Sequence, residues 1–122
     1  MAKTIMIVDD SASLRQAVAI ALKGAGYEIV EAGDGKEGLG ELDGKKINLI
    51  ISDVNMPNMD GIEMVQEIKK LPAYKFTPII MLTTEAGADM KERGKAAGVK
   101  AWVVKPFKPE QMLDAVSKLV AP

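Results

Sequence analysis

The stretch Ile47-Asn-Leu-Ile-Ile-Ser-Asp53 decides the fold, because it is a short apolar run that ends in a carboxylate. Such a run is typical of a buried strand in a parallel sheet. Three further runs also end in polar side chains: residues 5–8 before Asp9 and Asp10, residues 79–82 before Thr83, and residues 102–104 before Lys105. Open α/β sheets bind ligands outside the carboxyl ends of their strands. We therefore expect one crevice to hold three carboxylates, a hydroxyl and an ammonium group.

Apolar runs alternate with helical periodicity five times, which predicts an α/β fold of (βα)5 type on a parallel sheet. Residues 27–32 alternate polar and apolar side chains, as a half-exposed edge strand does. The expected helices run from about Ser11 to Gly26, over 36–42, from the N-cap Asp60 to Pro72, over 86–97, and from Pro109 onward.

Particular side chains are expected to shape these helices. The core face of the first helix is predicted at i, i+3 and i+4 spacing: Leu14, Val18, Ala21, Leu22 and Ala25. That of the third helix is Ile62, Val65, Ile68 and Leu71. Gly38 and Gly40 predict a weak second helix, and Gly94 predicts a flexible middle in the fourth.

The amino-acid composition excludes several classes of function. The chain has 122 residues, 48% apolar, with a net charge of −1 and no basic stripe, so nucleic acid is not an expected partner. The absence of Cys and His excludes thiolate catalysis and the usual transition-metal ligands, and any phosphohistidine must belong to another protein. With no targeting segment, membrane span, linker or repeat, the sequence predicts one cytoplasmic domain over residues 1–122 that does not bind membranes.

The aspartates also have plainer interpretations. Asp9 or Asp10 could cap the first helix, and Asp53 could be a turn residue. However, adjacent carboxylates repel each other unless a cation is near, and all three converge if the third strand lies beside the first. A cluster of hard oxygen ligands without His or Cys favours Mg²⁺, with Mn²⁺ as the alternative.

The whole constellation resembles the receiver domain of bacterial two-component response regulators, most closely the CheY-type chemotaxis regulators. The resemblance covers essentially the whole chain. It implies a flavodoxin-like, doubly wound five-stranded sheet of order 2-1-3-4-5 without an output domain. It rests on five elements in order: Asp9-Asp10, Asp53, Met56-Pro57 with Asp60-Gly61, Thr83-Thr84-Glu85, and Lys105-Pro106-Phe107.

The resemblance implies a phosphorylation site. Asp53 would be the phosphoacceptor, attacking a phosphohistidine of a partner kinase. Asp10 and Asp53 would ligate Mg²⁺ directly, Asp9 would do so largely through water, and Asn55 would offer its backbone carbonyl. Lys105 would pair with the phosphoryl oxygens, and its bond to Pro106 would be cis.

The resemblance also implies a switch. Thr83 would move to hydrogen-bond the phosphoryl group, and Asn55 and Glu85, two residues after Asp53 and Thr83, would set its lifetime. Trp102 stands where receivers usually carry Tyr or Phe, which puts the family's coupling of Thr to an aromatic ring in question. The plainer interpretation of Trp102 is packing on the last helix.

The expected partners are a sensor histidine kinase and a downstream target, which would be the flagellar switch if the route is chemotaxis. The target would meet the face formed by the fourth helix, fifth strand and fifth helix. A phosphatase is a further partner that the resemblance allows. We expect a monomer that is not an enzyme beyond catalysing its own phosphorylation and dephosphorylation.

Four alternatives compete with chemotaxis. The first is a phosphorelay intermediate outside chemotaxis, and the second is a Mg²⁺-dependent hydrolase with an aspartyl phosphate, although this chain has no cap insertion. Gly33-Asp-Gly-Lys-Glu-Gly38 matches a dinucleotide-binding fingerprint, but its acidic side chains would repel a pyrophosphate. A calcium loop beginning at Asp53 fails because Pro57 takes a ligand position.

Overall fold

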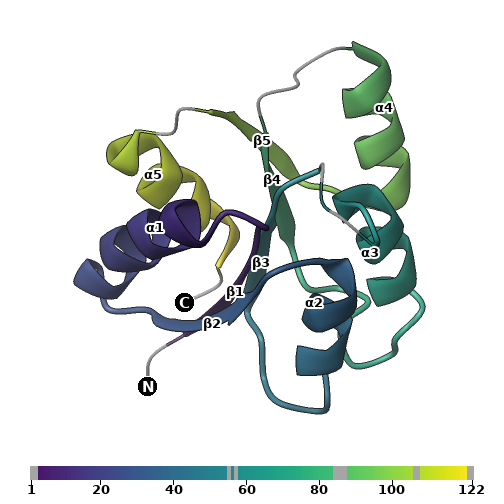
Figure 1. The fold of residues 1–122 in the computed structure, drawn as a ribbon, viewed down its shortest axis with the longest axis horizontal. Coiled ribbons are helices and arrows are strands. Elements are labelled where there is room, and N and C mark those ends of the chain that lie inside the picture. The colour runs from purple at the N-terminus through teal and green to yellow at the C-terminus, as the bar shows by residue number, and fades with distance from the viewer. Residues whose placement is uncertain (1–2, 55, 57, 84–87, 106–107, 121–122) are drawn as a thin grey trace.

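The computed structural model describes residues 3–54, 56, 58–83, 88–105 and 108–120. It shows a five-stranded parallel sheet with helices on both faces (Figure 1). The strand order β2-β1-β3-β4-β5 confirms the predicted fold. The strands are β1 (Thr4–Val8), β2 (Glu28–Ala32), β3 (Leu49–Ser52), β4 (Ile79–Thr83) and β5 (Ala101–Val104). The helices are α1 (Ala12–Gly24), α2 (Gly35–Glu41), α3 (Gly61–Ile68), α4 (Ala88–Ala97) and α5 (Pro109–Leu119).

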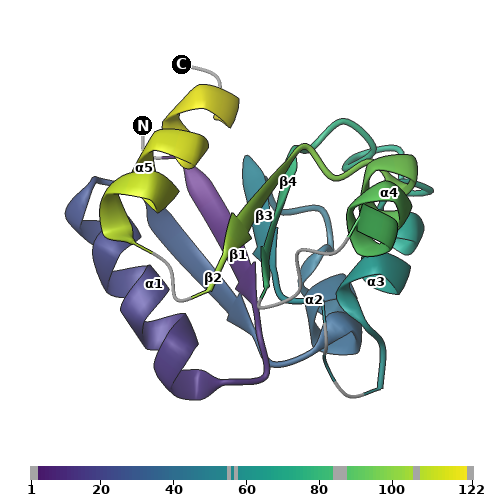
Figure 2. The same ribbon diagram turned by 90° about the horizontal axis from the view of Figure 1, so that it is seen from above.

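The sheet separates two hydrophobic cores. Figure 2 shows α1 and α5 on one face and α2, α3 and α4 on the other. Successive side chains of a strand point to opposite faces, so Ile5 and Ile7 of β1 pack towards α1 and α5, and Met6 and Val8 towards the other three helices. Among the described residues, no helix is long and apolar enough to cross a membrane.

The central pair of strands brings the predicted site together. Val8 of β1 lies opposite Ser52 of β3 in a parallel register. The N–H of Asp53 donates to the Val8 carbonyl over 2.9 Å, so the polar residues that follow both strands leave the sheet at neighbouring points. The edge strand β2 is only partly buried, as its alternating sequence predicts.

Two element boundaries differ from the sequence prediction. β3 begins at Leu49 rather than Ile47, because its pairing with β1 starts where Ile5 meets Leu49. α3 ends at Ile68 rather than just before Pro72, and Leu71 reaches the core from the turn that follows.

The core face of α1 was predicted correctly except near its carboxyl end, since Leu14, Val18 and Leu22 all lie in or against the core. Val18 and Leu22 are buried as predicted, together with Ala19, which the prediction omitted. Ala25 is exposed, because the helix ends at Gly24 and Ala25 is the C-cap residue. The core face of α1 therefore ends at Leu22, one turn earlier than predicted.

Gly38 of α2 has a packing role that the sequence did not suggest. A Cβ there would lie 2.9 Å from Sδ of Met64 and 3.3 Å from Cγ2 of Val8, so the missing side chain lets α2 lie close to α3 and the sheet. Gly40 has nothing within 4 Å and remains a helix glycine without a packing role.

Candidate functional site

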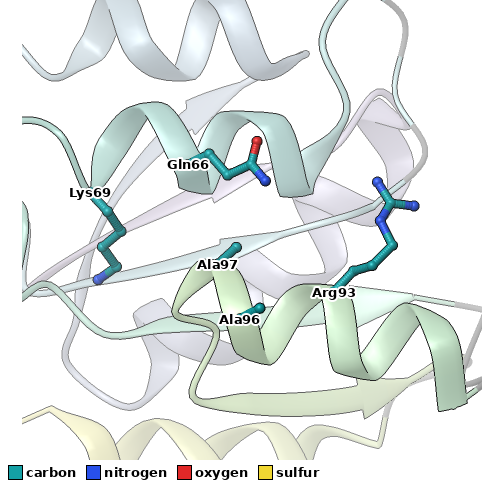
Figure 3. A pocket seen from close by; sticks show the side chains of 5 residues that line it. All are labelled: Gln66, Lys69, Arg93, Ala96 and Ala97. Carbon is teal, nitrogen blue, oxygen red and sulfur yellow. The ribbon is translucent and has the colours of Figure 1, made fainter.

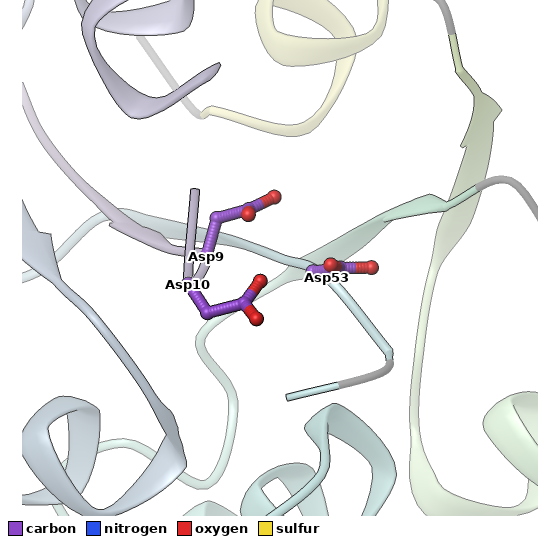
Figure 4. A group of neighbouring side chains, drawn as sticks. All are labelled: Asp9, Asp10 and Asp53. Carbon is purple, nitrogen blue, oxygen red and sulfur yellow. The ribbon is translucent and has the colours of Figure 1, made fainter. Parts of the chain in front are cut away.

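Three carboxylates meet at the carboxyl ends of β1 and β3 (Figure 4). One carboxylate oxygen from each of Asp9, Asp10 and Asp53 lies within 4.8 Å of the others. Asp9 and Asp53 are buried, at 2% and 8% exposure, whereas Asp10 is exposed. The structure thus brings together the carboxylates that the strand ends predict.

Lys105, which follows β5, joins the same cluster. Its Nζ lies 3.2 Å from Oδ2 of Asp9 and 3.2 Å from Oδ2 of Asp53. The other oxygen of Asp53, Oδ1, accepts a hydrogen bond from the Val54 N–H over 2.7 Å. Both oxygens of the Asp53 carboxylate are therefore held, and its orientation is fixed before any ligand arrives.

The capping alternative for the first aspartates is wrong. Ser11 is the N-cap of α1, and its Oγ accepts a hydrogen bond from the Leu14 N–H. Asp9 instead accepts from the Ser11 N–H through Oδ1 over 2.9 Å, while the guanidinium of Arg15 donates to the Asp9 carbonyl. Sequence reasoning missed Arg15, because nothing local in the sequence connects it with the carboxylates.

Gly61 begins α3 directly against the backbone of Asp53. Its N–H donates to the Val54 carbonyl over 2.8 Å, and a Cβ on it would lie 2.1 Å from the Asp53 carbonyl oxygen. The Oγ of Ser52 donates to that same oxygen over 2.8 Å. Asp60 caps the helix in a capping box with Glu63, as predicted. The motif Asp60-Gly61 therefore closes the loop behind Asp53.

The electrostatics of the site disfavour the ionised form of Asp53. Burial raises the pKa of Asp53, and the negative charge of Asp9 raises it further. The ammonium of Lys105 and the Val54 N–H act in the opposite direction, but they do not compensate fully. The net effect of the surroundings is thus to disfavour the charged form in the absence of a further cation.

This balance predicts that Asp53→Asn stabilises the metal-free protein at neutral pH by roughly 1 kcal/mol, a common size where a functional residue is strained. An unfolded Asp ionises near pH 3.9, whereas folded Asp53 holds its proton to higher pH. The contribution of Asp53 to stability should therefore fall as pH rises from about 4 through its raised pKa, so the difference between the wild type and Asp53→Asn should grow over this range. Urea denaturation in EDTA across this range measures the effect.

The control is Asp10→Asn, which removes an exposed carboxylate from the same cluster. It should stabilise the metal-free protein less than Asp53→Asn does. The asparagine at 53 can still accept from the Val54 N–H, so the comparison isolates the charge. An Asp53→Asn variant less stable than the wild type in EDTA would show that the Lys105 ion pair outweighs burial.

The carboxylates fit a divalent metal ion. Oxygens around octahedral Mg²⁺ lie roughly 3 to 4 Å apart, so small side-chain movements would complete a set that already lies within 4.8 Å. The donors are hard oxygens, and the chain has neither Cys nor His to recruit zinc. Asp9, Asp10 and Asp53 are the residues that could hold Mg²⁺ or Mn²⁺.

Trp102 lies on β5 opposite Met81 and is half-buried. Its indole packs on Gly94 of α4, where a Cβ would lie 2.3 Å from Cζ2 of the ring. The plainer interpretation placed this ring on the last helix, but the ring packs against the core on the other face of the sheet, where α4 lies (Figure 2). Gly94, which was expected to make α4 flexible, makes room for this indole.

Other predicted residues cannot be placed. Thr83 ends β4 opposite Val104, and its side chain is outside the described part of the structure. Asn55, Glu85 and the Lys105–Pro106 bond also fall outside the described residues.

The dinucleotide-binding alternative fails at Asp34. This residue caps α2, accepting from the Glu37 N–H over 2.9 Å and from Nδ2 of Asn58 over 2.8 Å. Both hydrogen bonds lower the pKa of Asp34, so a carboxylate stands where a pyrophosphate would have to bind. Gly35 and Gly38 are explained by close packing instead.

Known proteins share this arrangement. The family described as response regulator receiver domain matches residues 5–117. The structure of the chemotaxis protein CheY4 of Vibrio cholerae is similar with a TM-score of 0.94 and 45% identity, covering 98% of this chain and 99% of that chain. The chemotaxis protein CheY1 of Helicobacter pylori is 37% identical over 112 residues, 90% of each chain.

PilG of Pseudomonas aeruginosa is 34% identical over 112 residues, which are 92% of this chain and 83% of PilG. The chain spans only 54% of the length of a transcriptional regulator that it matches at 37% identity. The family match and the acidic site agree with the sequence prediction of a receiver that is not a true enzyme. This chain therefore belongs to the response regulator receiver domain family.

Proposed function

We propose that this chain is a stand-alone response regulator that accepts a phosphoryl group on Asp53 from a partner histidine kinase and then changes its protein partner. The observation that carries the proposal is the buried Asp53 carboxylate, held between the Val54 N–H and the Lys105 ammonium in an acidic crevice. Receiver domains take phosphate from histidine kinases, and this chain has no His of its own.

In the proposed transfer, a carboxylate oxygen of Asp53 forms the new O–P bond as the P–N bond of the donor phosphohistidine breaks. Lys105 already lies 3.2 Å from Asp53, so its ammonium is positioned to stabilise the charge on the transferred group. Mg²⁺, held by Asp9, Asp10, Asp53 and the Asn55 carbonyl, would add positive charge beside the phosphoryl oxygens.

The switch forms part of the same proposal. Thr83 would hydrogen-bond the phosphoryl group, and the movement would alter the packing of Trp102 against α4. Asn55 and Glu85, close in sequence to Asp53 and Thr83, would control the access of the water that hydrolyses the aspartyl phosphate.

We place the target on the face of α4, β5 and α5. Val104 of β5 is 48% exposed there and leaves an apolar side chain on this face. Beside it lies a hollow of about 340 Å³, and its lining comes from β5 and α5: Trp102, Val103, Val104, Gln111 and Ala115. An apolar side chain of a partner would fill this hollow and cover Val104.

Chemotaxis is the favoured route, because CheY4 and CheY1 are chemotaxis proteins. The protein would then act in the cytoplasm as a monomer on the flagellar switch, and a phosphatase could end the signal. A phosphorelay outside chemotaxis is the second candidate, because the chain also matches transcriptional regulators.

Incubation with acetyl phosphate and Mg²⁺, followed by intact mass measurement, tests the proposal. We expect the wild type to gain one phosphoryl group, and we expect Asp53→Asn to gain none. The exposed residue Asp114 of α5 provides a matched control, since Asp114→Asn should leave phosphorylation unchanged. Undiminished phosphorylation of Asp53→Asn would overturn the assignment of the phosphoacceptor.

A further inference from the structure

A groove between α3 and α4 shares no residue with the acidic crevice (Figure 3). Its volume is about 380 Å³, and five residues line it: Gln66, Lys69, Arg93, Ala96 and Ala97. Gln66, Arg93 and Ala96 are exposed, so the groove is open to solvent along its length. The two alanines of α4 leave space where longer side chains would fill it.

The two charged side chains that line this groove, Lys69 and Arg93, are both cationic. Among the ion pairs of the described residues, none includes Lys69, Arg93 or Lys100. The acidic side chains of α3 are engaged elsewhere, since Glu67 pairs with Lys70 and Glu63 completes the capping box. An anionic ligand would therefore meet two cations that form no ion pair with the side chains that the structure describes.

The surroundings of Lys69 disfavour its charged form. Its Nζ donates to the Thr77 carbonyl over 2.8 Å, and its side chain packs beneath Gly98. Burial lowers the pKa of Lys69, and the positive charge of Lys100 lowers it further. A negative charge in the groove would relieve both effects.

We propose that the groove between α3 and α4 binds an acidic peptide segment of a partner protein, with its carboxylates paired to Lys69 and Arg93. A peptide suits this groove better than a small enclosed anion, because the cations come from two helices and the site is open. Gln66 of α3 lines the groove (Figure 3), and its side-chain amide can both donate to and accept from a peptide bond. The occupied groove would connect α3 with α4 at a surface separate from the face formed by α4, β5 and α5.

Fluorescence anisotropy with a labelled hexaglutamate peptide tests the proposal on the full chain. We expect saturable binding that Arg93→Gln weakens by roughly fivefold, as the loss of a partly desolvated ion pair would. Lys69→Met keeps most of the aliphatic stem and should weaken binding by at least as much. Lys91→Gln makes the same charge change on α4 outside the groove and should change the affinity by less than roughly twofold.

Amide chemical shifts should locate the peptide at Gln66, Ala96 and Ala97. Arg93 is exposed, so its variant should fold normally even if Lys69→Met does not. The proposal is overturned by an absence of binding, by equal weakening in Lys91→Gln and Arg93→Gln, or by complete displacement by millimolar inorganic phosphate. The last result would identify a simple anion site.

Discussion

Gly61→Ala is expected to destabilise the fold by about 3 kcal/mol, at the upper end of what overpacking by one methyl group costs. The new Cβ would lie 2.1 Å from the Asp53 carbonyl oxygen, far inside van der Waals contact. That oxygen accepts from Ser52, and the Gly61 N–H donates to Val54, so neither backbone can withdraw without breaking a hydrogen bond. Gly61 does not have a positive φ, so the contact alone is the cause.

Urea denaturation measures this difference, and Gly40→Ala is the matched control. Gly40 lies in α2 with nothing within 4 Å, so the same substitution should stabilise by up to about 1 kcal/mol through helix propensity. Because Gly61 supports the backbone of the proposed phosphoacceptor, Gly61→Ala should also slow phosphorylation by acetyl phosphate. Equal urea midpoints for Gly61→Ala and the wild type would show that the loop can open without cost.

The sequence predicted the architecture because its apolar runs are short, regularly spaced and separated by amphipathic segments. Parallel strands place their carboxyl ends at one edge, so Asp9 and Asp53 could be brought together without coordinates. The errors lie at element ends, where tertiary contacts decide. β3 starts at Leu49 because Ile5 pairs there, and α3 ends at Ile68 although Leu71 continues its apolar spacing.

The packing roles of the glycines were the hardest feature to predict from the sequence. Their helix propensity is a local property, and it predicted weakness at Gly38 and Gly94 alike. The structure shows close approach at both positions, by Met64 and Trp102 respectively. Such contacts join different elements of the fold, and no local pattern predicts them.

The charges of the site were only partly predictable. Sequence placed Lys105 beside the carboxylates, but it could not show that one ammonium lies 3.2 Å from both Asp9 and Asp53. Nor could it show that Asp10 stays exposed while Asp53 is buried. The direction of the Asp53 pKa shift depends on that burial, which only the packed structure defines.

Gly94→Ala is expected to push the Trp102 indole away from α4, moving its emission to longer wavelength and increasing quencher access. A Cβ at position 94 would lie 2.3 Å from Cζ2 and 3.0 Å from Cη2 of the ring. Unlike the contact at Gly61, this clash involves the outer end of a side chain, which can rotate towards solvent. The higher helix propensity of Ala should stabilise the protein by about 1 kcal/mol, and the partial loss of indole packing should destabilise it. These two effects oppose each other, so the urea midpoint should change little.

The same variant tests whether Trp102 reports the switch. Because it is the only Trp, wild-type fluorescence should respond more to beryllofluoride with Mg²⁺ than to Mg²⁺ alone, and Asp53→Ala should lack the additional response. In Gly94→Ala the ring has left its contact in both states, so the additional response should disappear while phosphorylation persists. Gly40→Ala should retain it, because its methyl group contacts nothing. If emission and quencher access of the wild type are identical with and without beryllofluoride, Trp102 serves only to pack β5 against α4.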